Sequence, residues 1–245
     1  MMKSWRKLLP LGAALLTLTA TDNTSDAQVT QPHNVLFVGD SFTGAQDGIY
    51  SHFLKLSQSD PQAGPVMTDH VWVGGATLKR LWELGDAARS IDTDSYDVVV
   101  LQDDIPETNI DYFRQFARLF VEEARRHHAR PVLYMTWAYQ RLGWISMAQI
   151  AEAHRVLAKE LNVDIAPVGL AWERARRARP DLDLFAADRE HPSPFGMYLA
   201  TCVIYATIYG RNPTGLRYFP PELTLQEAAF LQSVAWQTVK KELKQ

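Results

Sequence analysis

The chain has 245 residues, of which 47% are hydrophobic and 22% are charged, and this composition excludes a disordered, collagen-like or polytopic membrane protein. Its 25 lysines and arginines are balanced by 28 aspartates and glutamates, so it lacks the basic surface that nucleic-acid binding requires. With Cys202 as its single cysteine, it can form neither an intramolecular disulfide nor a structural cysteine-zinc site.

The N-terminal segment has the pattern of a secretory signal. Basic residues between positions 3 and 7 precede an apolar run over 8–20, and small residues form a plausible cleavage site ending at Ala27. The apolar run is shorter than the roughly 20 residues that a membrane span requires. We therefore expect a signal peptide over 1–27, export to the periplasm or the cell exterior, no membrane span in the mature protein, and one domain over 32–245.

Along the mature chain, short buried runs predict strands, and longer stretches with a helical spacing of apolar residues predict helices. The predicted strands cover 34–39, a segment ending at 73, 98–101, 131–135 and 163–166. The predicted helices cover 110–127, 146–161, 195–209 and about 224–243, with capping patterns at 108–111 and 224–227. The continuous apolar strands suit a sheet covered on both faces. The alternation predicts a three-layer α/β/α sandwich with a mostly parallel five-stranded sheet.

Residues with catalytic chemistry follow the predicted strands. Ser41 lies in a Gly-Asp-Ser tripeptide after the first strand, and Gly75 lies in a Gly-Gly-Ala-Thr segment after the second. Ligands of parallel sheets bind at the carboxyl ends of the strands. A serine at a strand-to-helix turn can attack an acyl group, and the backbone N–H groups of Ser41 and Gly75 can donate to the resulting oxyanion.

A nucleophilic serine needs a base, and His191 is the best candidate among the seven histidines. Asp188 precedes it by three residues, a spacing at which one turn brings two side chains together. Pro192 and Pro194 restrict the backbone around it. We predict His191 as general base and Asp188 as the carboxylate that orients it.

Taken together, these segments resemble the SGNH hydrolases, also called GDSL-type esterases and acylhydrolases. The tripeptide ending at Ser41 resembles their nucleophile block, Gly75 their glycine block, and the segment 188–191 their final Asp-x-x-His block. The resemblance extends from residue 35 to about 209, and the segments 135–139 and 195–200 resemble a poorly characterised bacterial branch.

The resemblance implies a flavodoxin-like α/β/α fold with Ser41 as nucleophile, His191 as general base and Asp188 as its orienting partner. The chain departs from the family at the third block, where the family has an asparagine that donates to the oxyanion. Here the third strand ends in Gln102, whose amide carries the same donor on a longer arm. Asp103 and Asp104 follow, and for these carboxylates we expect helix capping or surface solvation, because an ionised carboxylate would repel an oxyanion.

The expected function is that of a secreted serine esterase acting on an O-acyl ester, with an acetyl or other short acyl group favoured. Trp137 and Tyr139 follow the fourth strand together with Trp144, and their rings could stack on a sugar. We therefore expect a small-molecule or glycan ester as substrate, with no metal or cofactor. Activity should rise between about pH 6 and 8, as the histidine loses its proton.

Three other functions use the same residues. An acetyltransferase would use the same triad and differ only in its product. A metal-dependent phosphoesterase could use Asp40, Asp103, Asp104 and His191 as oxygen and nitrogen ligands. A glycan-binding protein could keep the fold without turnover.

Overall fold

A computed structural model describes residues 31–105, 109–139 and 143–242. The predicted signal peptide, 1–27, lies outside the described residues. Within the described ranges, no helix has both the length and the apolar character needed to cross a membrane.

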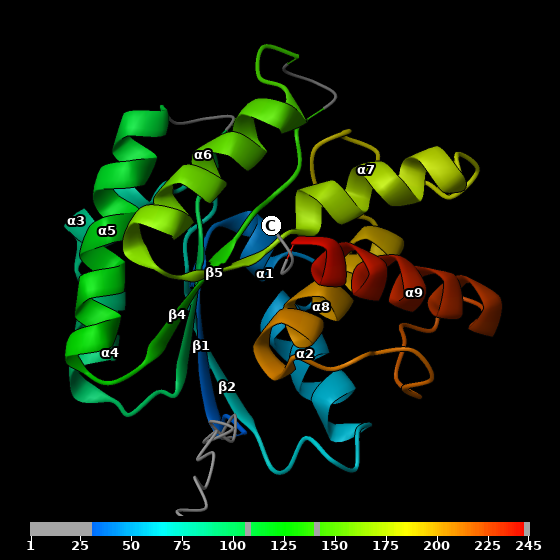
Figure 1. The fold of residues 1–245 in the computed structure, drawn as a ribbon, viewed down its shortest axis with the longest axis horizontal. Helices are drawn as coiled ribbons and strands as arrows, with labels where there is room; N and C mark the ends of the chain where they lie inside the picture. Colours follow the sequence, from blue (N-terminus) through cyan, green and yellow to red (C-terminus); the bar gives the residue numbers. More distant parts are fainter. Residues whose placement is uncertain (1–30, 106–108, 140–142, 243–245) are drawn as a thin grey trace, which may run out of the picture. The chain divides into compact units, whose positions relative to one another are not determined.

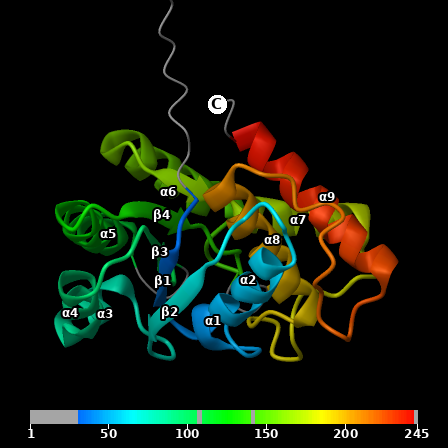
Figure 2. The same ribbon diagram turned by 90° about the horizontal axis from the view of Figure 1, so that it is seen from below.

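Five parallel strands form one sheet in the order β2-β1-β3-β4-β5 (Figures 1 and 2). The strands are β1 (Asn34–Gly39), β2 (Met67–Trp72), β3 (Val98–Gln102), β4 (Arg130–Tyr134) and β5 (Asp164–Ala166). The register places Leu36 of β1 between Asp69 of β2 and Val99 of β3. The predicted parallel sheet is confirmed.

Helices connect the strands on both faces of the sheet. They are α1 (Ser41–Gly44), α2 (Ile49–Gln58), α3 (Leu78–Leu84), α4 (Asp86–Thr93), α5 (Ile110–Arg126), α6 (Met147–Leu161), α7 (Val168–Ala178), α8 (Pro194–Tyr209) and α9 (Leu225–Glu242). The four helices predicted from periodicity correspond to α5, α6, α8 and α9. The other five have 11 residues or fewer, too short for a clear periodic signal.

The sheet separates two apolar cores, and β1 contributes to both. Val35 and Phe37 pack into one core with α2, α7, α8 and α9, whereas Leu36 and Val38 pack into the other with α3 to α6. Figures 1 and 2 show these two helical layers on opposite sides of the sheet. Helix α8 is buried along almost its whole length, which explains why its sequence is apolar on every side.

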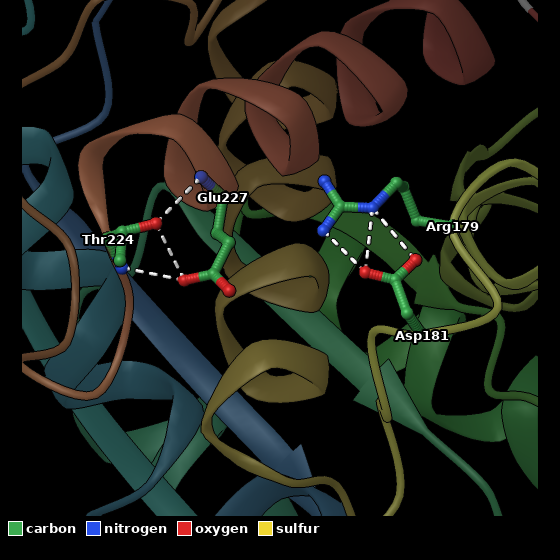
Figure 3. A network of polar contacts seen from close by, with 4 residues as sticks. All are labelled: Arg179, Asp181, Thr224 and Glu227. Carbon is green, nitrogen blue, oxygen red and sulfur yellow. Dashed lines mark hydrogen bonds and ion pairs between the residues drawn. The ribbon is translucent and has the colours of Figure 1, made fainter.

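The cap predicted for the last helix is confirmed (Figure 3). Both the backbone N–H and the hydroxyl of Thr224 donate to Glu227 Oε2 at 2.8 Å, and Glu227 N–H donates back to Thr224 Oγ1 at 3.3 Å. The same view shows Arg179 paired with Asp181 after α7. The N-cap of α5 is Asn109, whose Oδ1 accepts from Tyr112 N–H at 2.7 Å.

The direction in which the chain moves across the sheet reverses between the carboxyl ends of β1 and β3. The chain leaving β1 enters α1 and α2 on one face, whereas the chain leaving β3 reaches α5 on the other. Loops that diverge from adjacent strands in this way form the usual ligand site of an open parallel sheet. Ser41, the first residue after the β1 turn, lies at this point.

Candidate active site

The structure brings together Ser41, His191 and Asp188, of which the first two are 150 positions apart. Ser41 Oγ lies 2.8 Å from His191 Nε2, and His191 Nδ1 lies 2.7 Å from Asp188 Oδ2. The His191 side chain is 31% exposed and the Asp188 side chain 50%, so the group is open to solvent. A hydroxyl, an imidazole and a carboxylate in this order can transfer a proton from the hydroxyl to the ring.

Local hydrogen bonds explain why a Gly-Asp-Ser turn presents the hydroxyl. Asp40 caps α1, since its Oδ1 accepts from Phe42 N–H at 2.8 Å. A side chain on Gly39 would be impossible, because a Cβ there would lie 2.2 Å from both Gln102 Oε1 and Thr43 Oγ1. The glycine therefore allows β3 to approach the turn closely.

The loop that carries His191 is organised by Asp188. One carboxylate oxygen, Oδ1, accepts from the N–H groups of Glu190 and His191, both at 3.0 Å, while Oδ2 contacts the ring. Partial desolvation raises the pKa of Asp188, but these hydrogen bonds together outweigh it and leave the pKa below its ordinary value. Asp188 therefore stays ionised beside the imidazole. Pro194 then begins α8 at its first turn.

Aromatic side chains support the serine turn and the histidine loop from below. The ring of Phe42 lies 4.9 Å from Trp137, 5.3 Å from Tyr139 and 5.5 Å from His191. Trp137 Nε1 also donates to Glu190 O at 3.0 Å, which ties the end of β4 to the histidine loop. Phe42 was not among the predicted site residues, although an apolar residue directly after the serine was a usable signal for a buried contact.

This arrangement corrects the prediction that Trp137 and Tyr139 bind substrate. Both side chains are buried, and Trp137 stacks on Trp172 with ring centroids 3.8 Å apart. The Tyr139 hydroxyl donates to Asp104 Oδ1. Neither ring has a free face for a sugar, because packing has covered both.

Gln102 also differs from its predicted role as an oxyanion donor. Its Oε1 accepts from Asp40 N–H at 2.8 Å and from the Thr43 hydroxyl at 3.0 Å. Its Nε2 is buried and has no hydrogen-bond partner among the described residues. In this arrangement the nitrogen is not presented to an oxyanion at the protein surface. Gln102 therefore holds the serine turn from beneath.

Asp103 and Asp104, which follow Gln102, hold two other loops. Asp103 Oδ1 accepts from Leu78 N–H, at the start of α3, at 2.9 Å, and Asp104 binds the Tyr139 hydroxyl after β4. Residues 102–104 thus contact, one after another, the loops that follow β1, β2 and β4. Capping was expected for these carboxylates and Asp103 provides it, but surface solvation is wrong for both, because both are buried.

Burial of these acids changes their protonation. Burial raises the pKa of Asp103 to about 7; the Leu78 N–H bond opposes this rise, and the charge of Asp104 adds to it. Burial also raises the pKa of Asp40 well above its ordinary value, again with a contribution from Asp104. The floor of the site is therefore less negatively charged near neutral pH than its three aspartates suggest.

Gly75 lies in an exposed turn after β2, where Ala76 N–H donates to Val73 O at 3.0 Å. Its φ of +66° is in the left-handed region that favours glycine. A Cβ there would meet no atom within 4 Å, so conformation rather than space explains the residue. Its contribution to the oxyanion site stays a prediction.

The structure does not group the four donors named for a metal-dependent phosphoesterase. Within the described ranges, one set of three His, Cys, Asp or Glu residues has ligand atoms all within 4.8 Å of one another, namely Asp92, Glu123 and His127. This set lies on α4 and at the end of α5, and it shares no residue with the donors at the carboxyl edge.

Comparison by sequence finds no matching family model and no matching curated protein. Many solved structures are similar in fold, including the three that follow. A DUF4886 family protein from Bacteroides uniformis has a TM-score of 0.69 at 18% identity, covering 86% of this chain and 95% of its own. A protein from Slackia heliotrinireducens, provisionally classed as an SGNH hydrolase, has a TM-score of 0.60 at 26% identity, covering 72% and 98%. An acetylxylan esterase from Geobacillus stearothermophilus has a TM-score of 0.58 at 18% identity, covering 78% and 97%.

The two comparisons at 18% identity support the fold, and the Slackia protein adds a closer sequence relationship. All three match a five-stranded parallel sheet flanked by helices on both faces. The resemblance to the SGNH hydrolases that the sequence predicted is therefore supported by solved structures of the same fold.

Proposed function

We propose that the chain is a serine esterase that hydrolyses an O-acyl ester with an acetyl or other short acyl group. The observation that carries the proposal is the 2.8 Å separation of Ser41 Oγ and His191 Nε2, with Asp188 bonded to the other ring nitrogen. This geometry suits general-base activation of a hydroxyl nucleophile.

In the proposed reaction, Ser41 Oγ attacks the acyl carbon while its proton moves to His191 Nε2. The tetrahedral intermediate collapses as the bond to the alcohol oxygen breaks, and His191 returns the proton to that oxygen. A water molecule then attacks the acyl-enzyme with His191 again as base, releasing the acid and restoring the hydroxyl. Asp188 holds the tautomer in which Nε2 can accept the proton.

The oxyanion is proposed to accept hydrogen bonds from the backbone N–H groups of Ser41 and Gly75. Gln102 is not part of this proposal, because its amide nitrogen is buried. Loss of one such donor typically costs about 2.7–4 kcal/mol of transition-state stabilisation.

For the alcohol, we propose a carbohydrate. Support comes from the similarity in fold to the acetylxylan esterase. Export is also part of the proposal, on the basis of the signal-like pattern over 1–27. If it is correct, protein recovered from the periplasm or the medium should begin at Gln28 on N-terminal sequencing.

Labelling with a fluorophosphonate probe tests the enzyme proposal. The wild type should be labelled, and Ser41→Ala should not. Ser51→Ala, which alters a half-buried serine in α2, serves as matched control and should be labelled like the wild type. A folded wild type that resists the probe, or equal labelling of Ser41→Ala, would disprove the proposal. Product analysis with a sugar acceptor present then separates hydrolysis from acetyl transfer.

A further inference from the structure

Exposed aromatic rings are concentrated at the carboxyl edge of the sheet. Among the large exposed hydrophobic side chains of the described ranges, the aromatic ones are Trp72 (39% exposed), Tyr112 (44%) and Trp144 (58%). They follow three different strands: Trp72 ends β2, Tyr112 lies in the first turn of α5 after β3, and Trp144 precedes α6 after β4. Exposed apolar side chains mark a ligand site where they gather in one groove, whereas single ones are common on any surface.

Two of these rings line one groove of about 600 Å³. Its walls are formed by Thr77 before α3, by Tyr112 and neighbouring residues at the start of α5, and by Trp144 and Gln149 at the start of α6. Helices α5 and α6 contact each other over the same face of the sheet (Figure 1). The volume is large enough for a small ligand such as one or two sugar rings.

The groove borders the loop after β2, which also carries Gly75. Thr77 is two positions from Gly75, the proposed oxyanion donor, and the adjacent Leu78 is held by Asp103. A ligand in the groove would therefore lie against the loop that carries the proposed oxyanion donor.

The chemistry of the groove favours a neutral polar ring over an anion or an acyl chain. Trp144 is 58% exposed and has no aromatic or cationic partner among the described residues, so a large part of its ring is open to a ligand. Lys79 Nζ lies 5.9 Å from the Tyr112 ring centroid but is paired with Glu83. Among the described residues that line the groove, none is a cation and Asp111 is the one carboxylate. Within this described lining, a phosphate or carboxylate would have no unpaired positive side chain to bind.

Neutral hydrogen-bonding groups complete the groove. The oxygen of Asn109 accepts from Tyr112 N–H, and the oxygen of Gln149 accepts from Ser146 N–H. The amide nitrogens of Asn109 and Gln149 have no partner within the described ranges and can donate to hydroxyls. Flat rings beside such donors match the apolar face and the hydroxyl rim of a sugar.

We propose that this groove binds a sugar ring in the alcohol part of the substrate, with Trp144 as the stacking surface. The proposal rests on the esterase function proposed above and defines its substrate as an ester of a neutral carbohydrate. Trp144, rather than Trp137 or Tyr139, is therefore the ring that we expect to contact the sugar.

The test compares kcat/KM for acetylated xylotriose with kcat/KM for p-nitrophenyl acetate, which lacks a sugar. Trp144→Ala should lower the ratio of the two by roughly three- to tenfold, because a stacking contact is lost. Trp144→Phe, which keeps an aromatic face, should restore most of the ratio. Leu225→Ala, an exposed apolar position on α9, is the control and should leave both values unchanged.

Two kinetic results would overturn the proposal. One is a ratio that Trp144→Ala leaves unchanged. The other is a loss confined to p-nitrophenyl octanoate relative to the acetate, which would identify an acyl-chain site.

Calorimetric titration tests sugar binding in the groove independently of the esterase function. Ser41→Ala is titrated with xylotriose, cellotriose and the N-acetylglucosamine trimer, and binding of at least one should be lost when Trp144→Ala is added. Binding of none of them would refute the carbohydrate groove. Binding that depends on Trp144 in a protein that hydrolyses no ester would refute the esterase function and leave the groove intact.

Discussion

Asp103 offers a test of how the floor of the site is built, and the informative change is Asp103→Asn. The asparagine keeps a carbonyl oxygen to accept from Leu78 N–H, which Asp103 does at 2.9 Å. It removes the charge from a carboxyl whose other oxygen has no partner among the described residues. The variant should therefore resemble the wild type at low pH, when Asp103 is protonated, and differ from it at high pH.

The sign and size of the effect follow from the raised pKa. In the unfolded chain Asp103 loses its proton near pH 4, whereas in the folded chain it does so at about pH 7. Between these values the folded state binds more protons, so the free energy of unfolding of the wild type falls as pH rises. This difference in pKa corresponds to at most about 4 kcal/mol in the free energy of unfolding, and the wild type has lost all of it above pH 7. Asp103→Asn has no such loss.

Urea unfolding of both proteins from pH 4 to pH 8 measures this difference. The stability advantage of Asp103→Asn should increase between pH 4 and 7 and stay constant above. Asp103→Ala is the matched control: it also lacks the charge but leaves the buried Leu78 N–H without an acceptor, which costs about 1–3 kcal/mol at every pH. A gap between Asp103→Asn and wild type that stays constant over the whole range would refute a buried acid with a raised pKa.

Three further changes test other parts of the site. Asp188→Asn should lower kcat/KM for p-nitrophenyl acetate by roughly 10²- to 10⁴-fold through loss of the correct tautomer, with circular dichroism unchanged; full activity would contradict its orienting role. Gln102→Leu should cost about 2–5 kcal/mol in urea unfolding, because two buried donors to its oxygen lose their acceptor; wild-type stability would show that these bonds are dispensable. Trp137→Phe keeps the ring but loses the bond to Glu190 O, so we expect a reduced kcat with little change in KM, and a change in KM alone would argue for direct substrate contact.

The sheet could be predicted because its signal is local. The runs that form β1, β3 and β4 are continuous and apolar, and burial on both faces requires that pattern. Strand β2 is an edge strand with mostly exposed residues, so only its end was recognised. Helices α1 and α3 have four and seven residues, and such lengths give no distinct period.

The positions of Ser41 and His191 were predictable because strand ends converge and prolines restrict the loop. The direction of a side chain beneath the site was not predictable in the same way. Gln102 ends β3 and Trp137 follows β4, which are places where an oxyanion donor or a sugar-stacking ring is expected. The side chains of Gln102 and Trp137 are buried because the Ser41 turn packs against β3 and Phe42 packs against Trp137. These contacts cannot be read from the sequence.

The polar segment 102–104 explains why a site made of four separate loops can stay ordered. A buried carboxyl without a full set of partners destabilises the fold, and Asp103 is such a group. Its oxygen, however, is held at a fixed distance from α3, while its neighbours fix the turn after β1 and the loop after β4. Because the last residue of β3 and the two residues directly after it make all three attachments, a shift in any of these loops is resisted at the end of a central strand. The stability lost at Asp103 is thus linked to the position of the Gly75 loop. Asp103→Asn should separate the two effects, because it should be more stable than the wild type above pH 7 and still hold the Gly75 loop through Leu78 N–H.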